Sequence, residues 1–200
     1  MLKADAPLVG IEPSCILSFR DEYPDLVPPE MRQTARDLAA NCLLFDEVIM
    51  REVAAGRISP EAFRDDPVEV WLHGHCHQKA LVGIDKTAAA LRLLPGATVH
   101  VIPSSCCGMA GSFGYEKEHY RRSLEIGEMV LFPAVRRALG PSSDRLALAP
   151  ASAPSGCHAP AAGSTPTVVV APGTSCRQQI LDGTGAHAIH PVELLYGWLR

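Results

Sequence analysis

The stretch "TVHVIPSSCCGMAGSFGYE" (98–116) joins a short apolar run to two adjacent cysteines and then to a loop that contains three glycines. Residues 98–103 are predicted to form a buried strand, because the run is short, apolar and rich in β-branched side chains. Cys106 and Cys107 therefore follow the end of a strand. A long helical pattern comes next, at 116–139, with a kink expected before Pro133. The stretch thus predicts a strand, a cysteine-bearing loop and a helix in succession.

The same succession recurs on both sides of this stretch. Further strands are predicted at 68–73, 167–172 and 186–190. Further helices are predicted at 78–94, 175–183 and 191–200. Strands that alternate with helices are typical of an α/β fold, in which right-handed crossovers build a parallel sheet with flanking helices. We therefore expect a parallel sheet from residue 67 onward.

The first 66 residues have a different pattern. One strand is predicted within 6–12, a turn or short helix at 13–19, and a mostly helical segment at 29–56. One strand with two or three helices cannot form a layered core of its own, so this part must pack on the rest of the chain or on something absent. Residues 140–166 are rich in Pro, Ala, Ser and Gly, which predicts a flexible surface insertion.

Composition excludes several classes of function. The chain has 200 residues, with 18 basic and 22 acidic side chains, so nothing in its charge favours nucleic acid as a partner. It contains no apolar run long enough to span a bilayer and no signal-peptide pattern, so we expect a cytoplasmic location, with peripheral attachment to the inner membrane face left open. No GxGxxG, P-loop or hydrolase elbow is present.

Four of the seven cysteines are predicted to converge. Cys76 follows one predicted strand, Cys106 and Cys107 follow the next, and Cys176 follows a third and opens a helix. The carboxyl ends of parallel strands meet at one edge of the sheet, where α/β proteins bind their ligands. In a reducing compartment such cysteines are metal ligands or buried thiols. Four thiolates hold an iron–sulfur cluster, which we favour, or a zinc ion, which stays as the alternative.

Other polar side chains are expected near that edge: His73, His75, His77, Lys79 and His190. The three histidines around Cys76 are predicted to hydrogen-bond around the cluster, with direct ligation by one of them as the alternative. Lys79 could offset the negative charge of the thiolates or be an ordinary solvated residue. His190 ends the last predicted strand, where it lies near the cysteines or caps the following helix.

A weak internal repeat suggests one more ligand. "LVGIEPSC" (8–15) resembles "VVVAPGTSC" (168–176), so that Cys15 corresponds to Cys176 in an earlier copy whose other strands would precede residue 1. Cys15 is therefore a candidate ligand between two repeats. Cys42 is predicted to be a core residue within a helix, and Cys157 an incidental thiol in the insertion.

Several longer motifs together resemble a known family. They are "HGHCHQKAL" (73–81), "SSCCGMAGSFGYEKEHY" (104–120), "SLEIGEMVLFPAVR" (123–136) and "GTSCRQQILDGTG" (173–185). The chain resembles the C-terminal cysteine-rich CCG domain of fused dehydrogenases that contain FAD and iron–sulfur clusters and act on D-2-hydroxyacids such as D-lactate and D-2-hydroxyglutarate. Related domains occur in the iron–sulfur subunits of glycolate oxidase and anaerobic glycerol-3-phosphate dehydrogenase, and in heterodisulfide reductase.

The resemblance implies a Rossmann-like second CCG domain at 67–200, preceded at 1–66 by the end of a first repeat. It implies a [4Fe–4S]-type cluster that passes electrons to a quinone or cytochrome, while the FAD lies on a missing domain or partner subunit. The family's usual CxxC is here Gly173-x-x-Cys176, which alters the number of ligands. The alternatives are a zinc-bound or metal-free domain that docks a flavoprotein, and a non-functional gene fragment.

Overall fold

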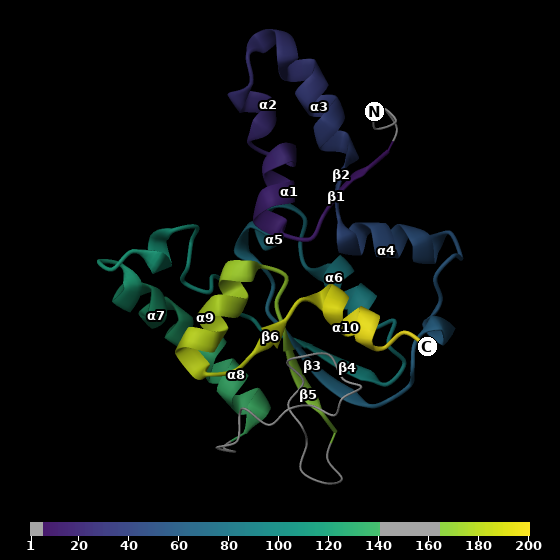
Figure 1. Ribbon diagram of the computed structural model, residues 1–200, viewed down its shortest axis with the longest axis vertical. Coiled ribbons are helices and arrows are strands. Elements are labelled where there is room, and N and C mark those ends of the chain that lie inside the picture. The colour runs from purple at the N-terminus through teal and green to yellow at the C-terminus, as the bar shows by residue number, and fades with distance from the viewer. Residues whose placement is uncertain (1–5, 141–164) are drawn as a thin grey trace.

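A four-stranded parallel sheet forms the centre of the molecule (Figure 1). The computed structural model describes residues 6–140 and 165–200. In spatial order the strands are β4 (Ala97–Val101), β3 (Val68–Leu72), β5 (Thr167–Val170) and β6 (Ala188–Ile189). Each neighbouring pair is parallel, so all four strands end at the same edge. The predicted α/β fold with a parallel sheet is confirmed.

Helices cover both faces of this sheet (Figure 1). One face packs on α4 (Phe45–Ala54), α6 (Asp85–Leu91) and α10 (Pro191–Gly197). The other face packs on α8 (Leu131–Leu139) and α9 (Thr174–Thr184), with α7 (Tyr120–Met129) beside them. Along β5, Val168 and Val170 enter the first core and Val169 enters the second, as the alternation of a strand requires. A strand buried on both faces explains the continuous apolar run at this place in the sequence.

The N-terminal part forms a smaller lobe. Its elements are β1 (Leu8–Gly10), α1 (Pro13–Arg20), α2 (Tyr23–Leu26), α3 (Arg32–Asn41) and β2 (Cys42–Leu44). β1 and β2 pair in parallel as a separate two-stranded sheet, and Ile16 and Leu17 of α1 pack on Cys42 and Leu44. The sequence predicts Cys42 as a core residue within a helix. It is buried, but it lies in a strand, because β2 interrupts the helical segment.

The long helical segments are also divided. The predicted helix at 78–94 is two helices, α5 (Cys76–Leu81) and α6, separated at Gly83, whose φ of +74° is left-handed. The segment at 116–139 breaks at Val130 into α7 and α8, which agrees with the kink expected before Pro133. Short 3₁₀ turns complete the described elements: Pro29–Met31, Pro60–Ala62 and Phe113–Tyr115.

Two further predictions concern the insertion and membrane-spanning segments. Most of the predicted insertion at 140–166, including Cys157, lies outside the described ranges. Among the described residues, no helix has both the length and the apolar character needed to cross a bilayer.

Candidate metal centre

Four cysteine thiols meet at the carboxyl edge of the sheet. Cys76 is the first residue of α5, just after β3, and Cys176 lies in the first turn of α9, just after β5. Cys106 and Cys107 occupy the loop that follows β4. The thiols interact in a row, Cys76 with Cys106, Cys106 with Cys107, and Cys107 with Cys176. The structure thus brings together residues that are far apart in the sequence.

The row alternates in its preference for protons. Interaction with Cys107, and then with Cys76, lowers the pKa of Cys106, and interaction with Cys107 lowers the pKa of Cys176 well below its usual value. Interaction with Cys106 raises the pKa of both Cys76 and Cys107. The four sulfurs therefore titrate as one coupled group that shares its protons, and a cation or an iron–sulfur cluster bound there would replace those protons.

The glycine loop holds its backbone N–H groups against the sulfurs. The N–H of Gly108 donates to Cys106 Sγ at 3.3 Å, and the backbone of Ala110 also stabilises that thiolate. Gly108 has a φ of +106°, and a Cβ there would collide with the carbonyl oxygen of Ser123 on α7. The glycine is therefore required by its own backbone conformation and by the close approach of α7.

His73 is buried beside the two most buried thiols of the row. One of its ring nitrogens and the sulfurs of Cys107 and Cys176 all lie within 4.8 Å of one another. Nδ1 of His73 forms a hydrogen bond of 2.7 Å with Ser104 Oγ. Nε2 has no hydrogen-bond partner among the described residues. A buried polar nitrogen without a partner is unusual and suggests that the site binds a further group.

His75 and Lys79 also face the thiols. His75 is buried with Nδ1 unpartnered within the described part of the chain, and a Cβ at Gly173 would lie 2.5 Å from its Cδ2. Lys79 donates to the carbonyl oxygens of Ser104 and, at 2.7 Å, of Ser105. Burial lowers the pKa of Lys79, while its charge interacts favourably with all four thiols. This cation therefore lies where it can offset thiolate charge.

The other predicted site residues lie elsewhere. His77 points toward Asp21 of α1, with 3.8 Å between Nε2 and Oδ2. His190 accepts from the Val192 N–H at its Nδ1, and its Nε2 lies 2.9 Å from the carbonyl oxygen of Ile11, so it caps α10 and contacts the N-terminal lobe. Cys15 is exposed on α1, and the contacts described above join the other four thiols without it.

Glu12 is a residue of this edge that the sequence did not indicate. Its Oε2 accepts from the Thr174 N–H at 2.8 Å and from Thr174 Oγ1 at 3.0 Å, so that it caps α9 from the other lobe. Burial works against ionisation, but the hydrogen bonds from Thr174 and Ser14 bring the pKa of Glu12 below its usual value. The contact joins residues 162 positions apart, and no local pattern signals it.

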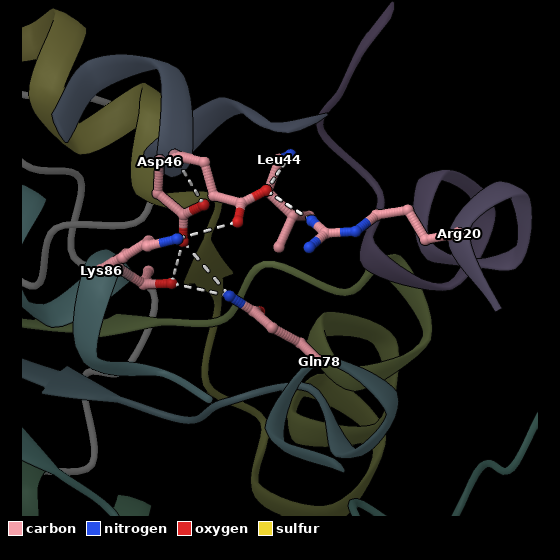
Figure 2. A network of polar contacts seen from close by, with 7 residues as sticks. Arg20, Leu44, Asp46, Gln78 and Lys86 are labelled. Carbon is pink, nitrogen blue, oxygen red and sulfur yellow. Dashed lines mark hydrogen bonds and ion pairs between the residues drawn. The ribbon is translucent and has the colours of Figure 1, made fainter. Parts of the chain in front are cut away.

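A buried polar network joins α5 to α4 and α6 (Figure 2). Asp46 accepts from Thr87 Oγ1, from Gln78 Nε2 at 3.2 Å, and from the Glu47 N–H at 2.8 Å. Burial raises the pKa of Asp46. The next residue, Glu47, forms ion pairs with Arg20 at 2.7 Å and with Lys86 at 2.9 Å. Since Gln78 belongs to the same helix as Cys76, the network fixes the start of that helix.

Comparison with known proteins confirms the resemblance seen in the sequence. The chain is 31% identical over 198 residues to D-2-hydroxyglutarate dehydrogenase of Escherichia coli K12, a match that covers 98% of this chain and 16% of that protein. It is 26% identical over 189 residues to one of the subunits of anaerobic glycerol-3-phosphate dehydrogenase from the same strain, covering 94% and 39% respectively. D-2-hydroxyglutarate dehydrogenase of Haemophilus influenzae is 26% identical over 201 residues, covering 100% of this chain and 17% of that protein.

The chain therefore spans about two fifths or less of the curated relatives to which it is similar. No family model matches it, and no solved structure matches it.

Proposed function

We propose that this chain is an iron–sulfur electron-transfer module. It is a homologue of segments of D-2-hydroxyglutarate dehydrogenase and of a subunit from anaerobic glycerol-3-phosphate dehydrogenase. It serves a flavin-dependent dehydrogenase of D-2-hydroxyacids and carries the centre at the carboxyl edge of its sheet. The observation that supports this most directly is the row of four thiols at that edge.

The residues present fit such a group. Four thiolates are the usual ligand set of an iron–sulfur cluster, and here Cys76, Cys106, Cys107 and Cys176 would supply them. Nε2 of His73 has no hydrogen-bond partner among the described residues, which indicates that this buried edge is built around a further group. When bound, the cluster would accept and release single electrons.

The protein's own groups have three roles at this site. Strand ends and helix starts fix the sulfurs, so that little reorganisation accompanies a change of charge. Backbone N–H groups of the glycine loop and the ammonium group of Lys79 stabilise negative charge on the sulfurs. Burial of Cys107 and Cys176, which are 3% and 1% exposed, keeps water away from that side.

A hydroxyacid donor requires a hydride acceptor that this chain does not provide. Cysteine and histidine side chains do not accept a hydride, whereas a flavin does. We propose that FAD lies on another domain or on a partner subunit, and that electrons leave to a quinone or a cytochrome. The purified chain should then reduce no dye with D-lactate or D-2-hydroxyglutarate until a flavoprotein polypeptide is added. Turnover by the flavin-free chain alone would overturn this assignment.

The metal itself is tested by anoxic reconstitution with iron and sulfide. We expect a brown protein with about four irons per cluster. Cys106→Ser and Cys176→Ser should lose or weaken iron binding, whereas Cys42→Ser, at a buried thiol in the N-terminal lobe, should not. A colourless chain with stoichiometric zinc would favour the interaction domain instead.

Cys15 remains a predicted fifth ligand, and the same assay decides it. If Cys15 contributes a thiolate, Cys15→Ser will lose iron as Cys176→Ser does. An unchanged iron content would remove Cys15 from the ligand set and restrict the cluster to the edge of the main sheet.

A further inference from the structure

We propose that His73 is a direct ligand of the metal centre through Nε2, so that the ligand set combines thiolates with one imidazole. This inference rests on the proposed function and specifies the site further. Three observations support it: the backbone and the ring of His73 are held in place, one ring nitrogen has no partner in the described part of the chain, and two thiols lie beside the ring.

The backbone of His73 is fixed by the sheet. It directly follows β3, and its N–H donates to the carbonyl oxygen of Val170 at 2.8 Å, which extends the pairing of β3 with β5 by one residue. The side chain is 0% exposed. A residue so placed cannot turn its ring toward solvent, so both nitrogens must find partners inside the protein.

Only one of the two nitrogens has a partner in the described part of the protein. Nδ1 is engaged with Ser104 Oγ at 2.7 Å, and Nε2 has none among the residues at 6–140 and 165–200. Metal-bound histidines usually bond a protein oxygen through one ring nitrogen, which orients the ring and leaves the other nitrogen free for the metal. In the tautomer whose Nδ1–H donates to Ser104 Oγ, the lone pair of Nε2 is available for a metal ion.

The imidazole of His73 lies beside two of the thiols. His73 forms a compact group with Cys107 and Cys176, whose ligand atoms are all within 4.8 Å of one another. The three residues come from the ends of β3, β4 and β5, three adjacent strands of one rigid sheet.

The other nearby histidines fit this role less well. His77 faces Asp21, and both ring nitrogens of His190 already form hydrogen bonds. His75 has an unpartnered Nδ1 among the described residues, but it does not belong to the compact group, and its ring lies against Gly173. His75 is therefore the matched control, since it is buried in the same segment two residues away.

A neutral imidazole at position 73 carries one negative charge fewer than a thiolate ligand at the same position would. In clusters with histidine ligands the reduction potential is higher than in all-cysteine clusters. We expect His73→Cys to bind iron but to have a lower potential than the wild type. His75→Gln should keep both the iron and the direct nitrogen ligand.

The test is pulsed EPR of the reduced, reconstituted chain grown with ¹⁵N-labelled histidine. The wild type should show a strongly coupled histidine nitrogen, which persists in His75→Gln and His77→Gln and disappears in His73→Cys. The wild-type spectrum and the two control variants carry the test even if His73→Cys does not fold.

Two results distinguish a failure of the His73 assignment from a failure of the proposed iron–sulfur function. Full iron content without strong nitrogen coupling, or coupling lost in His75→Gln, would overturn the assignment of His73 and leave the cluster in place. A wild-type chain that takes up no iron under anoxic conditions would overturn the proposed function, and this assignment with it.

Discussion

Replacing Asp46 with alanine should destabilise the chain strongly, although Asp46 contacts no cysteine. Its carboxylate is 0% exposed and accepts hydrogen bonds from the side chains of Thr87 and Gln78 and from the N–H of Glu47 (Figure 2). Thr87 and Gln78 are themselves buried, at 0% and 2% exposure. In Asp46→Ala these two side chains lose an acceptor in a place that water does not reach.

The magnitude follows from those two donors. A buried donor left without a partner costs about 1–3 kcal/mol. The variant also no longer buries a carboxylate, which returns part of the loss. We therefore expect the free energy of unfolding to fall by about 2–4 kcal/mol, a large share of the roughly 5–15 kcal/mol that stabilises a typical domain.

The assay is urea unfolding of the apo chain, followed by tryptophan fluorescence and extrapolated linearly to water. Trp198 is buried in the main core and reports its loss. The matched control is Asp37→Ala, at an exposed carboxylate on α3 that accepts from Gln33 at 2.9 Å, where a change within about 0.5 kcal/mol is expected. If Asp46→Ala is no less stable than Asp37→Ala, the buried network does not support α5 as argued.

Three further predictions test charge and packing. Burial raises the pKa of Asp46 above its usual value near 3.8, so the folded state holds the Asp46 proton more tightly than the unfolded state does. The stability that this group contributes should therefore be greatest below pH 3.8 and should decline as the pH rises. In urea titrations, Asp46→Asn should lose this part of the pH dependence. The pKa of Glu12 is lowered, so its cap on α9 stabilises the folded state above pH 4.5, the usual pKa, and this stabilisation is lost as the pH falls. Glu12→Ala should lower the free energy of unfolding by about 1 kcal/mol at pH 7, and an equal loss at pH 3 would contradict this. Gly127→Ala should lower the melting temperature, because a Cβ at position 127 collides with the Phe132 ring. Overpacking costs about 1–3 kcal/mol, which outweighs the gain of about 1 kcal/mol in helix propensity. An unchanged or higher melting temperature would contradict this prediction.

The main sheet could be predicted from the sequence because its strands are buried on both faces. Such strands give continuous apolar runs, and the topology of parallel sheets then places residues that follow them at one edge. This is why Cys76, Cys106, Cys107 and Cys176 could be grouped before their geometry was known. The weaker strand β2 was missed because its three apolar residues, Cys42–Leu44, also fit a helical period.

Sequence patterns do not predict polar contacts between residues that are distant in the sequence. Glu12 caps a helix of the other lobe, and Asp46 lies inside a segment whose other polar residues suggest a solvated helix face. Neither contact has a local periodicity, since each is decided by how two separate elements pack. His73 was predicted near the thiols, but the hydrogen bond with Ser104 that fixes its ring appears only in the structure.

The order of the strands also sets when the thiol row can form during synthesis. β3 lies between β4, its neighbour in sequence, and β5, which follows about a hundred residues after β3 begins. Cys76, Cys106 and Cys107 therefore leave the ribosome well before Cys176, and the edge stays incomplete until β5 pairs with β3. A nascent chain can hold only a partial set of thiols, so loading of the centre must await nearly complete translation of this segment.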